Sequence, residues 1–399
     1  MLIAAGDADT ALAFVEIGAL VLGLALLSRL AGRFGLTAIP LYLVAGLAMG
    51  EGGLIQLDVS RDFFEIAAEI GVLLLLFALG LEYSDTELRS GLRSGLAPGV
   101  VDMLLNALPG LALGLLLGWE PLAAVLLGGV TWITSSGVVS KALSDLGRLG
   151  FRETPAVLNL LVIEDLAMAV YLPVVAALIV GGSATTTVTS VAIALATVLV
   201  ILLAALRYGR PFSNLVAGGS DEAFLLMIFG ITLLVAGIAQ SFEVSGAIGA
   251  FLVGLALSGK AEERANQLIS PLRDLFAATF FLFFSFQIDP ADLFDAALPA
   301  LGLATVTALT KMATGWYAAG RVGAAPKGRM RAGTVLIARG EFSIVIAALG
   351  SQLVDGPQLG ALAAGYVLVT AILGPLAAKF SDRLPLPHRL MRRRVPSTA

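Results

Sequence analysis

The chain has 399 residues, of which 58% are hydrophobic and 14% charged, whereas soluble domains carry about 25% charged residues. The absence of cysteine excludes disulfides, thiolate metal sites and thiol catalysis. The single histidine, His388, lies in a basic C-terminal segment, which argues against a histidine-based active site or transition-metal site. Apolar runs of about 20 residues recur along the chain, and this pattern predicts an all-α polytopic membrane protein in a lipid bilayer.

We expect thirteen membrane spans, and these account for nearly the whole chain. In order they are residues 11–29, 36–50, 63–83, 94–117, 121–143, 155–180, 186–206, 222–242, 245–259, 271–288, 298–320, 331–351 and 358–379. Acidic rather than basic residues precede the first run, so it reads as a retained span and not as a signal peptide. The prediction is one transmembrane domain over residues 1–385, followed by a basic cytosolic tail over 386–399.

The basic residues are strongly biased to one side of this predicted topology. Of the 25 Lys and Arg residues, all but Arg61, Lys311 and Arg339 fall in one set of alternate loops and in the C-terminal tail. Because Lys and Arg collect in cytoplasmic loops, we expect a protein of the cell (inner or plasma) membrane. Its N-terminus is predicted to lie outside and its C-terminus in the cytoplasm.

The two halves of the chain resemble each other weakly. Arg61-Asp62 opens the third span and Arg273-Asp274 opens the tenth, in matching positions. A linker span at 186–206 between repeats at about 11–180 and 222–380 would give the two six-helix repeats opposite orientation, as in many secondary transporters. Chance similarity between apolar helices is the alternative.

In such inverted repeats the substrate site lies where corresponding helices are broken. The fifth span contains Thr131-Trp132-Ile133-Thr134-Ser135-Ser136-Gly137, and the twelfth contains Ala338-Arg339-Gly340-Glu341-Phe342-Ser343. Each is the fifth span of its half. The alternative is that the hydroxyls bond to backbone or bridge helices, as they commonly do in membranes.

Charged residues inside the spans are the main functional signal. Glu164 and Asp165 lie near the centre of the sixth span, and an ionised carboxylate at that depth costs roughly 2.5–3.5 kcal/mol on insertion scales. They indicate an ion or proton path, or alternatively a neutralised pair that holds helices together. Lys311, central in the eleventh span, needs a carboxylate partner, and Glu164 and Asp165 are the candidates.

Other intramembrane polar residues are predicted to be structural. Arg339 and Glu341 are expected to pair across the break and to brace the crossover. For Asp102, Asn106, Glu16, Glu65, Glu69 and Gln240, placement near the membrane interface is explanation enough.

Carboxylates, hydroxyls and one amine suit alkali cations and protons. If Asp165 binds either a proton or a monovalent cation, and only the occupied protein changes conformation, obligatory exchange follows. The sequence therefore predicts an antiporter, with Thr134, Ser135 and Ser136 completing the cation shell and no cofactor besides the transported ions. The alternative is a cation channel, or channel-like efflux system, gated by a cytosolic subunit. An intramembrane enzyme is disfavoured because no nucleophile or metal set can be assembled, and we expect no nucleic-acid partner.

Several motifs, in this order and spacing, resemble the monovalent cation:proton antiporter-2 family of Kef-type potassium/proton and sodium/proton antiporters. They are Ile39-Pro40-Leu41-Tyr42-Leu43-Val44-Ala45-Gly46, Phe77-Ala78-Leu79-Gly80-Leu81-Glu82, Thr134-Ser135-Ser136-Gly137, Glu164-Asp165-Leu166, Leu272-Arg273-Asp274-Leu275-Phe276, Lys311 and Arg339-Gly340-Glu341-Phe342. The resemblance covers nearly the whole chain.

This resemblance implies an elevator-like antiporter, usually a homodimer, with crossing broken helices in a mobile core. It implies that Asp165 is the shared ligand for proton and cation, and that Glu164 tunes the charge together with Lys311. Many Kef-type relatives carry a cytosolic nucleotide-binding domain, which we do not expect in this sequence. A separate regulatory subunit that docks on the basic face is expected instead.

Overall fold

The computed structural model describes residues 2–34, 37–50, 61–81, 85–180, 218–241, 246–286 and 288–383, together with isolated positions between 181 and 217. Every regular element within these ranges is helical, so the predicted all-α class is confirmed. Eight helices in this described part of the chain are long and apolar enough to cross a membrane. The predicted linker span, 186–206, lies almost entirely outside the described residues.

Long and short helices alternate in the same order in the two halves of the chain. The first half contains α1 (Leu2–Arg33), α2 (Ile39–Met49), α3 (Arg61–Leu81), α4 (Asp85–Leu116), α5 (Pro121–Trp132), α6 (Ser136–Asp145) and α7 (Thr154–Val180). The second contains α9 (Asp221–Ser241), α10 (Gly246–Ala256), α11 (Lys260–Phe286), α12 (Pro290–Arg321), α13 (Pro326–Val335), α14 (Glu341–Leu349), α15 (Gly356–Phe380) and the 3₁₀ turn η1 (Ser381–Arg383). In each half the second helix has 11 residues, the fourth has 32, and the fifth is broken into two short pieces.

Both predicted breaks are therefore present. The fifth span consists of α5 and α6, and the twelfth consists of α13 and α14. Among the helices that begin earlier than the sequence predicts are α4 at Asp85, α11 at Lys260 and α12 at Pro290. Their first turns carry polar and charged residues, so the apolar signal starts well inside each helix.

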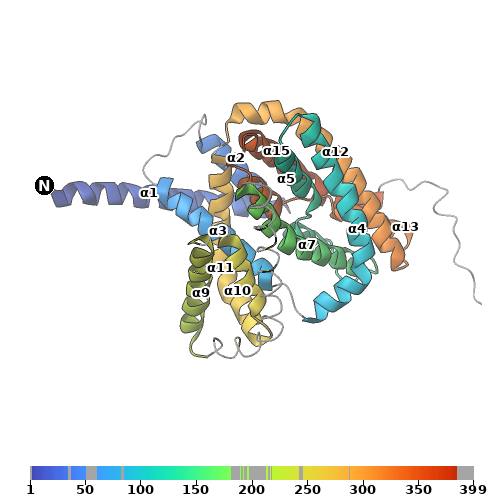
Figure 1. The fold of residues 1–399 in the computed structure, drawn as a ribbon, viewed down its shortest axis with the longest axis horizontal. Helices are drawn as coiled ribbons and strands as arrows, with labels where there is room; N and C mark the ends of the chain where they lie inside the picture. The colour runs from blue at the N-terminus through green and yellow to red at the C-terminus, as the bar shows by residue number, and fades with distance from the viewer. Residues whose placement is uncertain are drawn as a thin grey trace, which may run out of the picture.

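The helices form two bundles that lie side by side (Figure 1). We call α2, α3, α9, α10 and α11 the panel bundle, because they pack mainly on one another, with α1 against α2. The core bundle consists of α4, α5, α6, α7, α12, α13, α14 and α15. Figure 1 shows α1 projecting from the molecule, and only 11% of its apolar window is buried within the chain.

Glycines allow close helix contacts inside each bundle. A Cβ atom on Gly254 of α10 would collide with the carbonyl of Phe77 on α3, and one on Gly315 of α12 would lie 2.5 Å from the Cα of Gly333 on α13. Small residues at such contacts let helix backbones approach in a membrane. At the boundary between the bundles, by contrast, a Cβ on Gly360 of α15 would lie 3.9 Å from Ile288 and Phe284, which is ordinary contact.

Candidate ion-exchange site

The two broken helices meet at their unwound segments. Ile133 and Ser135 have extended backbone between α5 and α6. The backbone N–H of Ser135 donates to the carbonyl of Ala338, between α13 and α14, at 3.0 Å. This contact brings together four helix ends: the C-termini of α5 and α13 and the N-termini of α6 and α14.

Arg339 satisfies the carbonyls at the two C-termini. It is fully buried and donates to Thr131 O of α5 from Nε at 3.1 Å and from Nη2 at 2.7 Å. Its Nη1 donates to Leu336 O at 3.1 Å and Ile337 O at 2.9 Å. The last carbonyls of a helix have no intrahelical partner and carry partial negative charge, so one guanidinium neutralises both ends.

Glu341 lies instead at the two N-termini. It begins α14, and its Oε2 accepts from Ser135 Oγ at 2.9 Å. Ser135 caps α6 by accepting from the N–H of Val138 at 3.3 Å. Among the described residues, Arg339 and Glu341 form no ion pair with each other, contrary to the sequence-based expectation. The reason is that the unpaired groups of the helix ends lie nearer to each side chain.

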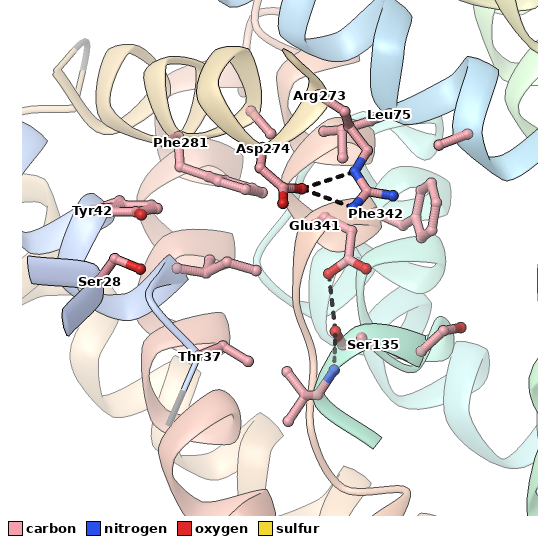
Figure 2. Close-up of a pocket in the computed structure, with 17 residues that line it drawn as sticks. Ser28, Thr37, Tyr42, Leu75, Ser135, Arg273, Asp274, Phe281, Glu341 and Phe342 are labelled. Carbon is pink, nitrogen blue, oxygen red and sulfur yellow. Dashed lines mark hydrogen bonds and ion pairs between the residues drawn. The ribbon is translucent and has the colours of Figure 1, made fainter. Parts of the chain in front are cut away.

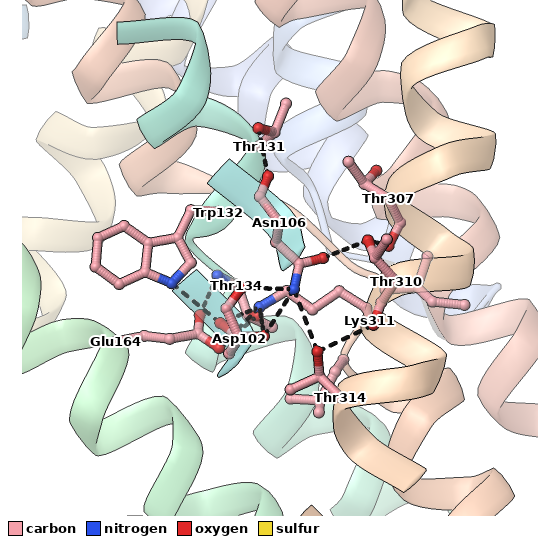
Figure 3. A network of polar contacts seen from close by, with 12 residues as sticks. Asp102, Asn106, Thr131, Trp132, Thr134, Glu164, Thr307, Thr310, Lys311 and Thr314 are labelled. Carbon is pink, nitrogen blue, oxygen red and sulfur yellow. Dashed lines mark hydrogen bonds and ion pairs between the residues drawn. The ribbon is translucent and has the colours of Figure 1, made fainter. Parts of the chain in front are cut away.

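Lys311 lies between two carboxylates in the core bundle (Figure 3). Its Nζ is 2.7 and 2.8 Å from the two carboxylate oxygens of Asp102 and 2.9 Å from Oε1 of Glu164. All three residues are fully buried. They come from three helices, α4, α7 and α12, and so hold both halves of the chain together.

Interfacial placement, which we expected for Asp102 and Asn106, is wrong, because both side chains are fully buried. Trp132 Nε1 donates to Asp102 Oδ2 at 3.0 Å, and Asn106 Nδ2 donates to Asp102 Oδ1 at 2.9 Å. Thr310 Oγ1 in turn donates to Asn106 Oδ1 at 2.7 Å. The i, i+4 spacing of Asp102 and Asn106 places them on one face of α4, and this spacing was the signal that could have revealed an inward polar stripe.

Glu164 and Asp165 are adjacent in sequence but have different surroundings. The Glu164 carboxylate accepts from the Thr134 N–H at 2.6 Å and from Thr134 Oγ1 at 3.1 Å, in addition to Lys311. Asp165 is buried, and its Oδ2 accepts from Ser136 Oγ at 3.1 Å. The structure thus places Glu164 in the ion-paired network and Asp165 beside the first turn of α6.

A cavity of about 360 Å³ extends from Ser136 to the surface, between the two bundles. Its core-bundle wall includes Ser135, Ser136 and Glu341, and its panel-bundle wall includes Tyr42 and Asp274 (Figure 2). Ser136 therefore contacts the cavity on one side and the buried Asp165 on the other. Oxygen ligands of this kind suit hydrated alkali cations and protons.

Crossed broken helices with charged residues at their centre define a membrane transporter of the sodium/proton-antiporter fold. A solved structure of the sodium/proton antiporter MjNhaP1 from Methanocaldococcus jannaschii matches with a TM-score of 0.69 and 15% identity, over 92% of this chain and 99% of that one. The match supports two inverted six-helix repeats. The model of the family "Sodium/hydrogen exchanger, transmembrane" matches residues 19–380, and the chain belongs to that family.

Two curated relatives match at nearly full length. The K⁺/H⁺ antiporter subunit KhtU of Bacillus subtilis is 35% identical over 387 residues, which is 95% of each chain. The ammonium/H⁺ antiporter subunit AmhT of Alkalihalophilus pseudofirmus is 27% identical over 361 residues, which is 87% of each. This protein is therefore a multi-pass membrane antiporter for cations and protons, a secondary transporter rather than an enzyme.

Proposed function

We propose that the protein exchanges a monovalent cation, K⁺ or Na⁺ with K⁺ slightly favoured, for protons that compete with the cation at Asp165. The carrying observation is that Asp165 is buried yet linked through the Ser136 hydroxyl to an open cavity. Glu164, by contrast, already accepts bonds from Lys311 and Thr134. Asp165 is thus the carboxylate of the pair that an ion from the cavity reaches first.

The cation shell would be completed by oxygen atoms of the unwound segment. The Ser136 hydroxyl already bonds to Asp165, whereas those of Thr134 and Ser135 bond to Glu164 and Glu341. Rotation of these two hydroxyls, together with backbone carbonyls of the break, would supply further ligands. We favour K⁺ over Na⁺ as the exchanged cation because KhtU is named a K⁺/H⁺ antiporter and because the motifs resemble Kef-type proteins.

Exchange requires that the loaded protein moves and the empty one does not. The close glycine contacts lie inside each bundle, and ordinary contact joins the bundles at Gly360. This packing is compatible with an elevator-like movement of the core bundle against the panel bundle. In the empty state the ionised Asp165 would oppose the movement, because carrying a carboxylate charge through an apolar environment is costly.

The assembly is also part of the proposal. We expect a homodimer in the cell membrane, with the N-terminus outside and the basic C-terminal face in the cytoplasm. KhtU and AmhT are both named as subunits, which supports an assembly with a further subunit. In this proposal that partner is a separate regulatory subunit docked on the basic face.

The direct test of the central residue is Asp165→Asn. This change keeps the size of the side chain and its bond to Ser136 but removes the exchangeable proton and the charge. We expect proton–cation exchange in everted vesicles to be abolished, with normal membrane insertion and an unfolding temperature close to that of the wild type. Substantial residual exchange would remove Asp165 from the central role.

A further inference from the structure

The lining of the cavity between the bundles includes two carboxylates that the proposed exchange at Asp165 does not use. Glu341 lies on its core-bundle wall, and Arg273 and Asp274 lie on its panel-bundle wall (Figure 2). The Asp274 side chain is 69% exposed, so the cavity opens to the surface there. With about 360 Å³, and about 30 Å³ per water in the liquid, the cavity has room for a cation with several waters.

Glu341 has an oxygen free for a ligand. Its Oε2 accepts from Ser135, but among the described residues Oε1 has no hydrogen-bond donor. Gly137, opposite, leaves space, since a Cβ atom there would lie 3.7 Å from Oε1. The Glu341 carboxylate is thus held by one oxygen and presents the other to the cavity.

A second oxygen on the opposite wall is also unsatisfied. The hydroxyl of Thr37, which lines the same cavity, is buried and has no hydrogen-bond partner among the described residues. Buried polar groups nearly always have a partner. A bound cation or its water shell would satisfy both the Thr37 hydroxyl and Glu341 Oε1.

The charge of the cavity comes from Glu341. Arg273 donates to Asp274 Oδ1 from Nε at 3.0 Å and from Nη2 at 2.8 Å, so these two charges largely cancel. The remaining carboxylate gives the lining one net negative charge. Ser135 and Ser136 are consecutive, and Ser136 donates to Asp165, so a cation that enters here meets Glu341 before Asp165.

We propose that Glu341 is a further cation-binding residue for the exchange reaction: a transit ligand that attracts a hydrated monovalent cation into this cavity and passes it to Asp165. This inference rests on the proposed function and extends the bracing role expected for Glu341. In the proposed orientation the cavity faces the cytoplasm. The contribution of Glu341 to cation affinity is therefore one-sided.

The test compares cation KM from the two sides of the membrane, in everted and right-side-out vesicles, for Glu341→Gln and Glu341→Asp. Glutamine keeps the acceptor for Ser135 but removes the charge, while aspartate keeps the charge. For Glu341→Gln we expect a three- to tenfold higher KM for K⁺ on the cavity side and a change below about 1.5-fold on the other. Glu341→Asp should recover at least half of that loss.

A rise in KM that is equal on both sides, or no rise at all, would overturn the proposal, because bracing alone has no sidedness. Arg273→Gln provides an independent test should Glu341→Gln fail to insert. Loss of the opposing positive charge should lower the cavity-side KM two- to threefold, and an unchanged or higher value would contradict the proposal. Asp165→Asn in the same vesicles separates the two ideas. Residual exchange in Asp165→Asn refutes the proposed function. Lost exchange in Asp165→Asn together with an unchanged cation KM in Glu341→Gln refutes only the transit role.

Discussion

Lys311 is the residue whose charge has the most consequences for the site. One ammonium group lies within 2.9 Å of two carboxylates, and none of the three side chains is accessible to solvent. Removal of one partner of a buried pair costs about 3–5 kcal/mol, because a buried charge is left without compensation. Here two carboxylates would lose their common counter-ion.

We therefore expect Lys311→Ala to lower the unfolding temperature of the detergent-solubilised protein substantially and to change the pH profile of exchange, without creating a new substrate. The physical reason is the uncompensated charge of Asp102 and Glu164. The matched control is Lys141→Ala, whose partner Asp145 is four residues away and whose side chain is 41% exposed. Such surface pairs contribute about 0–1 kcal/mol. Equal unfolding temperatures and pH profiles in the two variants would contradict this account.

Sequence reasoning found some of these residues and missed others for identifiable reasons. Lys311 and Glu164 were found because a central charge in a membrane span requires a partner. Asp102 was missed because its distance from the span end was considered and the direction of its side chain was not. The bonds of Arg339 could not be predicted, because backbone carbonyls leave no mark in the sequence.

At the scale of elements, the crossing of the broken helices is stabilised by opposite charges at opposite helix ends. Arg339 lies at the C-termini of α5 and α13, and Glu341 at the N-termini of α6 and α14. Each charge matches the sign that the helix dipole favours at that end. The crossing gives polar groups of the unwound backbone partners within the core bundle, as non-helical backbone at membrane depth requires.

Contact between α12 and α13 gives a test of this architecture. Gly315→Ala places a methyl group 2.5 Å from the Cα of Gly333, so α13 must shift away from α12, and overpacking of this kind costs about 1–3 kcal/mol. We expect a lower unfolding temperature and reduced exchange. Gly302→Ala, on the same helix, is the control, because no atom lies within 4 Å of its new Cβ. If Gly315→Ala were as stable as Gly302→Ala, the close contact of α12 with α13 would be wrong.

The positions of most helices were predictable, and their starts were not. Apolar runs located the spans, the hydroxyl residues and Gly137 of the fifth span located the first break, and the symmetry of the two halves located the second. The start of α11 was placed at 271 instead of Lys260 because Lys260, Glu262, Glu263 and Arg264 interrupt the apolar signal. Those residues form a polar helical extension that hydropathy does not detect.

At the scale of the molecule, the two bundles contribute different parts of the site. The core bundle contains the ion-paired network, both breaks and Asp165, and the panel bundle forms the opposite wall of the cavity. The proposed cation path thus runs along the boundary between two tightly packed bodies. A sliding movement there would expose Asp165 to one side and then to the other without unfolding either bundle.

Competition at one carboxylate makes a prediction for the whole transport cycle, which is measurable by pH-gradient dissipation in proteoliposomes. With K⁺, Na⁺ and Li⁺ titrated separately under a potential clamp, the account predicts saturable exchange with the lowest KM for K⁺. It further predicts that each KM rises as the pH falls, approaching tenfold per pH unit in the acidic range, while the maximal rate at saturating cation changes little. A cation affinity that is the same at all pH values, or single-channel currents in place of exchange, would contradict it.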